Sequence, residues 1–207
     1  MTAPGWPARL SHEAVEVRPM RLRDAASWVE VRRRNRGWLE PWEGRSPQAP
    51  ASTWDERHTV SVYLAMLRAA RRESRAGRAL PFAVTHEGAL VGQVTVSTVV
   101  RGAFDSASIG YWVDERVAGR GVTPTALALV VDHCFRGVGL HRLEANVRPE
   151  NEPSMRVVRK LGFREEGRHA RFLFIDGDWR DHVTFALTRE DLPDGVLVRW
   201  LQTRGGG

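Results

Sequence analysis

Cysteine is almost absent from this chain: Cys134 is the only one among 207 residues. A disulfide framework is therefore excluded, and we expect a reducing compartment, the cytoplasm. No apolar run approaches the ~20 residues that a membrane helix needs. Residues 1–11 lack the basic and apolar regions of a signal peptide. The histidines show no metal-ligand spacing, so neither a membrane anchor nor a metal site is expected.

Lysine is equally scarce, since Lys160 is the only one, and the formal net charge of +6 rests on arginine. The arginine excess has two explanations that the sequence leaves open: attraction to RNA or an acidic cofactor, and a biased base composition of the gene. The chain is 42% hydrophobic and 27% charged, which is typical of a soluble globular protein. We expect one domain over residues 1–207, with its core at about 14–190 and a disordered tail at 203–207.

The stretch 108–135 combines a strand, a glycine loop and a helix. Ile109–Val113 is β-branched and aromatic, which predicts a strand. Gly119 and Gly121 leave backbone N–H groups unobstructed, and Thr123 followed by Pro124 predicts a helix start. Free N–H groups before a helix form an anion site suited to a pyrophosphate. The predicted helix has a buried stripe of Ala126, Leu127, Val130, Val131, Cys134 and Phe135.

Two common phosphate loops do not fit this stretch. There is no Gly-Lys-Ser/Thr, and Pro124 stands where the dinucleotide fingerprint has its third glycine. What remains is Arg-x-x-Gly-x-Gly, in which Arg116 and Arg120 add cations beside the loop.

The rest of the chain alternates between predicted strands and helices. Segment 38–44, which contains two Trp and two Glu residues, is predicted to be irregular. Gly92 is predicted to mark a β-bulge. The order predicts a mixed, mostly antiparallel central sheet flanked by helices. Strands are predicted at 15–20, 81–85, 90–100, 109–113, 140–147, from 163 onward, and 180–187, with 169–175 pairing with 180–187. Helices are predicted at 23–36, 54–77, after 123, and 154–161.

Several segments together resemble the GNAT N-acetyltransferases, over about residues 14–190. They are Gly110–Val113, Arg116–Gly121, Glu150–Ser154 and Lys160–Phe163. Two others, Pro41–Glu43 and Ile175–His182, resemble the ribosomal-protein alanine N-acetyltransferases of the RimJ/RimL type. The resemblance implies a single α/β domain with the GNAT (acyl-CoA N-acyltransferase) fold, and acetyl-CoA as co-substrate without a metal.

The resemblance also implies where coenzyme A binds. In the family, the strand at 111–113 splays from a neighbour that begins near Leu143, and pantetheine lies in the gap. The Val113 N–H is then the best donor to the oxyanion. The cofactor-binding residues implied in this way are Tyr111, Trp112, Val113, Arg116, Ala118, Gly119, Arg120, Gly121, Val122, Thr123 and Asn151.

Asn151 and Ser154 are the implied catalytic residues. The family places an Asn at this helix start, where it contacts pantetheine or orients the thioester, and a Ser three residues on can protonate the departing sulfur. The alternative is that both are ordinary helix-start residues. Other branches use a Glu five residues before the Asn and a Tyr seven after it. Those positions are Asn146 and Val158 here, so we expect no dedicated tyrosine acid.

Trp38, Glu40, Trp42 and Glu43 are the implied substrate-binding residues. Carboxylates there would attract a cationic amine, and tryptophan faces would hold it by cation–π contact; the alternative is that the tryptophans only pack the loop. The general base stays open among Glu43, His141, Glu144, Asp181 and a water relay.

Proton loss favours an α-amine as the acceptor. An α-amine has a pKa near ~8 and a lysine near ~10.4, so losing the lysine proton costs roughly 3.5 kcal/mol more. We therefore expect acetylation of a protein N-terminus, such as that of a ribosomal protein, by a monomer or homodimer that requires no nucleic acid and no membrane. A small-molecule amine as acceptor, and a non-catalytic RNA- or ribosome-binding module, are the alternatives.

Overall fold

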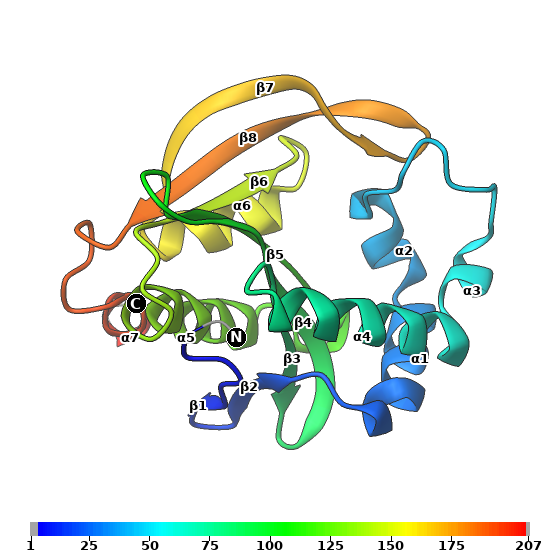
Figure 1. The fold of residues 1–207 in the computed structure, drawn as a ribbon, viewed down its shortest axis with the longest axis horizontal. Helices are drawn as coiled ribbons and strands as arrows, with labels where there is room; N and C mark the ends of the chain where they lie inside the picture. Colours follow the sequence, from blue (N-terminus) through cyan, green and yellow to red (C-terminus); the bar gives the residue numbers. More distant parts are fainter. Residues whose placement is uncertain (1–3, 206–207) are drawn as a thin grey trace.

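The computed structural model describes residues 4–205. The fold is organised around a single mixed β-sheet (Figure 1). Its strand order is β1-β2-β3-β4-β5-β6-β8-β7. The strands are β1 Leu10–His12, β2 Val15–Pro19, β3 Leu80–His86, β4 Ala89–Val100, β5 Ser106–Val113, β6 Arg142–Val147, β7 Arg164–Ile175 and β8 Asp178–Thr188. The helices are α1 Ala25–Arg34, α2 Arg36–Leu39, α3 Trp54–Arg57, α4 Val60–Arg75, α5 Val122–Arg136, α6 Glu152–Lys160 and α7 Val196–Gly205, with 3₁₀ turns η1 Leu22–Asp24, η2 Glu40–Trp42 and η3 Glu115–Val117.

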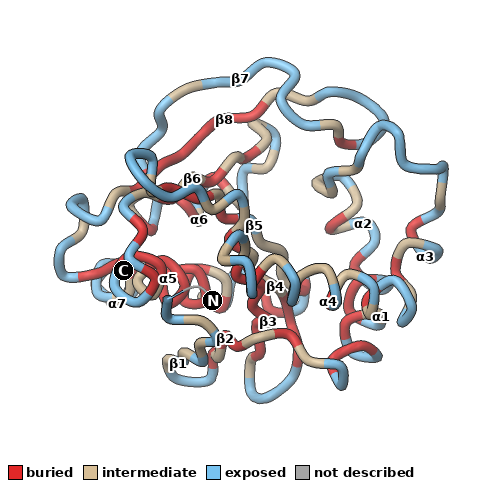
Figure 2. The backbone as a smooth tube through the Cα atoms, viewed as in Figure 1, coloured by how far each residue is buried: buried red, intermediate tan, exposed pale blue. Residues whose placement is uncertain are grey.

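Helices cover both faces of the sheet, as the sequence predicted. Successive side chains of a strand point to opposite faces, and β3 divides them accordingly. Phe82 and Val84 join the larger core, to which α5 contributes most, while Ala83 joins the smaller core beneath α1 and α4. Helix α5 is buried along nearly its whole length (Figure 2). No helix within residues 4–205 is long and apolar enough to cross a membrane.

The sheet is antiparallel except where β5 meets β6. This parallel pair has only three partners on each strand, ending at Ser108 opposite Glu144. Beyond that point 109–113 and 145–147 diverge, so the predicted splay near Leu143 is confirmed. The predicted bulge is confirmed as well: Val84 pairs with Gly92 and Thr85 with Leu90, which leaves Val91 extra. Gly92 is needed there because a Cβ would lie 2.5 Å from the Trp112 carbonyl oxygen.

The glycine loop opens α5 two residues earlier than predicted. Gly121, with φ +83°, is the N-cap and Val122 the first helical residue, so the assignment of Thr123 as N-cap was wrong. Glycine adopts this left-handed conformation without steric cost and makes the turn itself. All six residues of the predicted stripe are buried.

Two predictions about the N-terminal half were wrong. Segment 38–44 is not irregular, because α2 and η2 run through it to Trp42. The predicted helix 54–77 is two helices, α3 and α4. His58 has non-helical angles, and the Thr59 side chain caps α4 by accepting from the Val62 N–H. Val60, predicted to face inward, is 47% exposed because it lies in that first turn.

The predicted disordered tail is also corrected. Residues 203–205 belong to α7, and residues 206–207 lie outside the described part of the chain. Helix α7 is held by contacts with α5: the Asp132 carboxylate accepts from the Val196 and Leu197 N–H groups, and the Trp200 indole donates to Thr125 Oγ1 at 2.9 Å. These tertiary contacts fix a segment that carries little helical signal of its own.

Candidate active site

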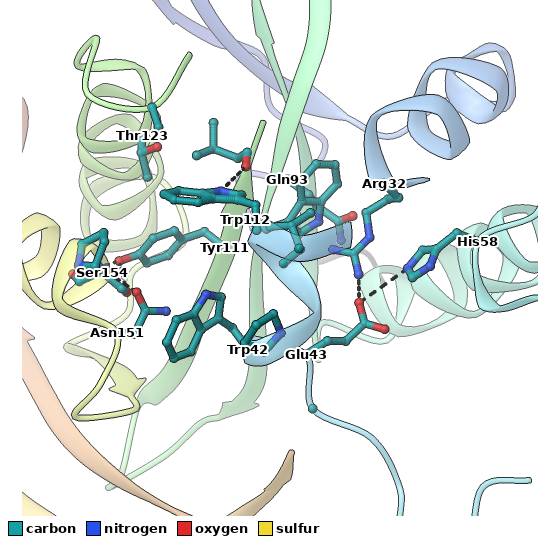
Figure 3. Close-up of a pocket in the computed structure, with 18 of the residues that line it drawn as sticks. Arg32, Trp42, Glu43, His58, Gln93, Tyr111, Trp112, Thr123, Asn151 and Ser154 are labelled. Atoms are coloured by element: carbon teal, nitrogen blue, oxygen red, sulfur yellow. Dashed lines mark hydrogen bonds and ion pairs between the residues drawn. The ribbon is translucent and has the colours of Figure 1, made fainter. Parts of the chain in front are cut away.

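A cavity of about 1140 Å³ extends from the glycine loop across the end of β5 to the segment between α1 and α4. The divergence of β5 from β6 places the end of β5 in its wall. Figure 3 shows two groups of side chains in this cavity. Tyr111 and Ser154 point toward one another on one side, and Arg32, Glu43 and His58 meet on the other.

The glycine loop forms the coenzyme side of the cavity. The first backbone bond of α5 runs from the Thr125 N–H to the Gly121 carbonyl at 3.1 Å, so the N–H groups of Val122 and Thr123 precede the helical ladder. Four predicted cofactor-binding residues of the loop and helix start line the cavity: Ala118, Gly119, Gly121 and Thr123.

Three other predicted cofactor residues of this loop, Arg116, Arg120 and Val122, do not line the cavity. Within residues 4–205, the exposed guanidinium groups of Arg116 and Arg120 have no acidic partner and remain available to an anion. The Val122 side chain is buried, so only its backbone can face a ligand. Free N–H groups, available cations and an open cavity are what a pyrophosphate-bearing coenzyme requires.

Val113 presents its backbone to the gap between the strands. The Asp114 N–H bonds to Val91 of β4 at 2.7 Å. Because successive backbone groups of a strand alternate in direction, the Val113 N–H and carbonyl point away from β4. The Trp38 indole confirms this for the carbonyl, to which it donates at 3.1 Å. Trp38 is thus tied to the strand edge that the resemblance assigns to pantetheine.

Asn151 and Ser154 meet Tyr111 at the start of α6. The Asn151 side chain is the N-cap of α6 and accepts from the Ser154 N–H at 3.2 Å. The Ser154 hydroxyl lies 2.7 Å from the Tyr111 hydroxyl, which also lies 3.3 Å from the Ser154 carbonyl. Burial raises the pKa of Tyr111 to about 12. A tyrosine thus reaches the predicted proton donor from β5, although α6 has Val158 at the position where other branches carry one.

The predicted substrate-binding carboxylates are both engaged by arginines. Glu43 forms ion pairs with Arg32 and, at 3.5 Å, with Arg57. Glu40 pairs with Arg36 at 2.8 Å and does not line the cavity. The hydrogen bond from Arg36 holds the pKa of Glu40 below its usual value.

The residue that follows the first subfamily motif, Gly44, meets the first residue of the second, Ile175. Trp42 lies under the Arg148 guanidinium, whose centre is 5.3 Å from the ring centroid, and Arg148 donates to the Pro41 carbonyl at 2.9 Å. Gly44 forms an isolated bridge with Ile175 at the end of β7. The β7–β8 hairpin therefore arches over to the segment after α2 (Figure 1) and holds it from the C-terminal half.

Arg32 is a site residue that the sequence reasoning missed. It is 6% exposed, lines the cavity, and lies over the rings of Trp28, Trp54 and Trp112 at 4.8 to 5.8 Å. Burial, and then the charge of Arg57, lower the pKa of Arg32 to about 9. The spacing of Trp28 and Arg32, one helical turn apart, is the signal that could have found it.

His58, which lines the same wall, was missed as well. Its Nδ1 lies 2.7 Å from the Trp54 carbonyl, which can only accept, so Nδ1 carries the proton. Its Nε2 lies 3.5 Å from Glu43. Burial, followed by the charge of Arg32, lowers the pKa of His58 to about 4, so the ring is neutral.

The other conceivable bases are not at the cavity. His141 pairs with Glu190, Glu144 with Arg142, and Asp181 with Arg168, and none of these three candidates lines it. Glu43 is the only one of the four that does. No cluster of three or more potential metal ligands occurs in the described chain.

A splayed parallel strand pair beside a glycine loop and helix start defines an acyl-CoA-dependent N-acyltransferase. The chain belongs to the GNAT acetyltransferase family, whose domain model matches residues 15–164. It is an N-acetyltransferase that uses acetyl-CoA. The fold and family predicted from the sequence are confirmed.

Named relatives cover nearly the whole chain. It is 33% identical over 190 residues to the Escherichia coli [ribosomal protein uS5]-alanine N-acetyltransferase, covering 90% of this chain and 94% of that protein. It is 31% identical to the probable N-acetyltransferase YjcK of Bacillus subtilis, covering 88% and 98%. The structure of Mycobacterium smegmatis RimJ in complex with CoA-disulfide is similar with a TM-score of 0.91 and 44% identity, covering 98% and 97%.

Proposed function

We propose that this enzyme acetylates the α-amine of a protein N-terminus, in the cytoplasm and with a ribosomal protein as acceptor. The observation that carries the proposal is the continuous cavity, which joins the glycine loop to the segment held between α2 and the β7–β8 hairpin. The name of the Escherichia coli relative supports the acceptor class. The proposed enzyme acts as a monomer or homodimer.

Acetyl-CoA supplies a thioester, and the chain's own groups would orient and polarise it. The N–H groups of Gly119, Gly121, Val122 and Thr123 hold the pyrophosphate, together with the guanidinium groups of Arg116 and Arg120. The backbone N–H of Arg120 itself donates to the Val117 carbonyl at 3.4 Å. The Val113 N–H, directed into the strand gap, donates to the oxyanion that forms when the amine attacks the carbonyl carbon. Asn151 caps α6 and thereby sets the position of Ser154 beside the departing sulfur.

We assign proton delivery to Ser154, with Tyr111 as a positioning residue. The two hydroxyl oxygens lie 2.7 Å apart and either can donate; when Tyr111 donates to Ser154 Oγ, the Ser154 hydroxyl hydrogen is free to point into the cavity. As the carbon–sulfur bond breaks, Ser154 donates that hydrogen to the thiolate, and the proton that the attacking amine loses returns to Ser154 through water in the cavity, while Tyr111 holds Ser154 in place. The pKa of Tyr111, raised to about 12, keeps it protonated across the working range.

The acceptor wall favours a neutral amine. Glu43 is shared between Arg32 and Arg57, and His58 is neutral, so two positive charges face one negative charge. A like charge nearby disfavours the protonated form of an amine. An α-amine, with its lower pKa, loses its proton there more readily than a lysine.

The test compares two peptides of one sequence, which begins with alanine and contains a lysine. One has a free N-terminus and the other is N-terminally capped. Mass spectrometry should find acetylation of the free α-amine and none of the capped peptide. Equal rates on both would contradict the N-terminal assignment, and turnover of neither would favour a small-molecule amine as acceptor.

A further inference from the structure

Helix α4 carries a row of four exposed arginines, which we name the basic ridge: Arg68, Arg71, Arg72 and Arg75. Their spacing of i, i+3, i+4 and i+7 places them on one side of the helix, over about 10 Å at a rise of about 1.5 Å per residue. Glu73 is the only acidic residue of α4, and Arg78 engages it at 2.7 Å.

Most of the ridge lacks acidic partners. Within the described residues 4–205, Arg68, Arg71 and Arg75 form no ion pair and no side-chain hydrogen bond, and Arg72 reaches only Glu73, at 3.5 Å. Most other arginines of this arginine-rich chain are paired with an acid, as Arg9, Arg168 and Arg189 are. A biased base composition accounts for the number of arginines and leaves their unpaired clustering on one helix side unexplained.

The helix dipole accounts for only part of the ridge. Cations are stabilised in the last turn of a helix, which explains Arg72 and Arg75, but Arg68 and Arg71 precede that turn.

The ridge lies away from the cavity. Val62 and Met66 are the α4 residues that line the cavity. At about 100° per residue, the centre of the ridge lies roughly 150° around the helix axis from them. A polyanion on the ridge would therefore leave the coenzyme and acceptor sites open.

We propose that the basic ridge binds the phosphate backbone of structured RNA and so brings the enzyme to a ribonucleoprotein acceptor. Guanidinium groups match phosphate oxygens in a bidentate geometry. A membrane surface fits less well, since interfacial helices carry large apolar side chains beside their basic face. The exposed large apolar residues of α4, Val60 and Val62, lie at its start. The choice of RNA rests on the proposed ribosomal acceptor.

The experiment measures anisotropy of a fluorescent RNA hairpin of about 20 nucleotides with the full chain, at about 50 to 200 mM salt. The ridge variant carries Arg68→Gln, Arg71→Gln and Arg75→Gln. The matched control carries Arg9→Gln, Arg168→Gln and Arg189→Gln, so each variant goes from +6 to +3 (6 − 3). The ridge variant should bind at least tenfold more weakly. The slope of log affinity against log salt should fall by about two, at about 0.7 to 0.9 per phosphate contact.

The control should retain wild-type affinity, and both variants should acetylate a short peptide at the wild-type rate. No RNA binding by the wild type, or an equal loss in both variants, would overturn the proposal. It would also be overturned if the ridge variant lost binding to phosphatidylserine vesicles while keeping RNA. Failure of the proposed acceptor is distinguishable, because it appears in the peptide assay whatever the RNA result.

Discussion

The hydroxyl pair of Tyr111 and Ser154 offers the sharpest test of the chemistry. Tyr111→Phe removes one hydroxyl whose two contacts are both with Ser154, at 2.7 and 3.3 Å. A neutral hydrogen bond of this kind contributes about 0.5 to 1.5 kcal/mol. At 1.36 kcal/mol per tenfold, kcat should fall about 2- to 13-fold, with little change in the KM for acetyl-CoA.

Ser154→Ala should cost more, because it removes the donor itself. General acids contribute about 10²- to 10⁴-fold, but a thiolate with a pKa near ~8.5 is a good leaving group. We therefore expect a loss near the lower end, about 10- to 100-fold in kcat. The pH profile of kcat/KM should rise toward the pKa of the acceptor amine. It should not fall again below about pH 10, since Tyr111 has its pKa raised to about 12.

The assay is a double-mutant cycle on single-turnover rates, with coenzyme affinity and melting temperature measured for each variant. If Tyr111 acts through Ser154, adding Tyr111→Phe to Ser154→Ala should change nothing further. Additive losses would refute the positioning role of Tyr111, because Tyr111 would then act independently of Ser154. A fully active Ser154→Ala enzyme would remove Ser154 from the mechanism and leave proton delivery to water.

Four further predictions concern the coenzyme loop, the helix cap and the buried charges. Gly119→Val should abolish the thermal shift produced by coenzyme A. Gly88→Val, a control with a similar positive φ and equally open surroundings, should carry the same strain of about 1 to 2 kcal/mol and keep the shift. Asn151→Ser preserves a capping oxygen, so unchanged activity would reduce Asn151 to a helix cap, whereas we expect activity to fall. Glu43→Gln leaves Arg32 as a buried unpaired charge and should destabilise the fold by about 3 kcal/mol in denaturant titrations; an unchanged midpoint would contradict that pairing. His58 is neutral when folded and binds a proton when unfolded, so the stability it contributes is present above about pH 6.5 and is lost toward pH 4. The free energy of unfolding should fall by roughly 3 kcal/mol over this range, and His58→Gln should remove this pH dependence.

Local patterns of the sequence were enough for the coenzyme side of the enzyme. The strand before Asp114, the two glycines and the following apolar helix form a contiguous unit, and its β-branched, glycine and helix-start signals act within a few residues of one another. The splay of β5 from β6 followed from the resemblance to the family. The proposed roles of Asn151 and Ser154 came from it too, since helix-start residues look alike whatever they do.

The acceptor side was decided only by the tertiary structure. Glu40 and Glu43 look like free carboxylates in the sequence. In the fold Arg36, one turn before Glu40, pairs with it, and Arg32 of α1 and Arg57 of α3 approach Glu43. The cage around Arg32 likewise draws its tryptophans from α1, α3 and β5. Spacing along one helix indicates only neighbours one turn apart, such as Trp28 and Arg32; pairing and burial between elements depend on distance in space, which the sequence does not report.

Contacts between distant segments also explain why the sequence did not predict α7 or the partner of Tyr111. Helix α7 is held by Asp132 and Thr125 of α5. Tyr111 of β5 reaches Ser154 only because the start of α6 lies beside it in the fold. The sequence determined which segments become strands and helices wherever the apolar period is strong. Where a helix or a charge is stabilised by a distant partner, packing of the folded chain decided the outcome.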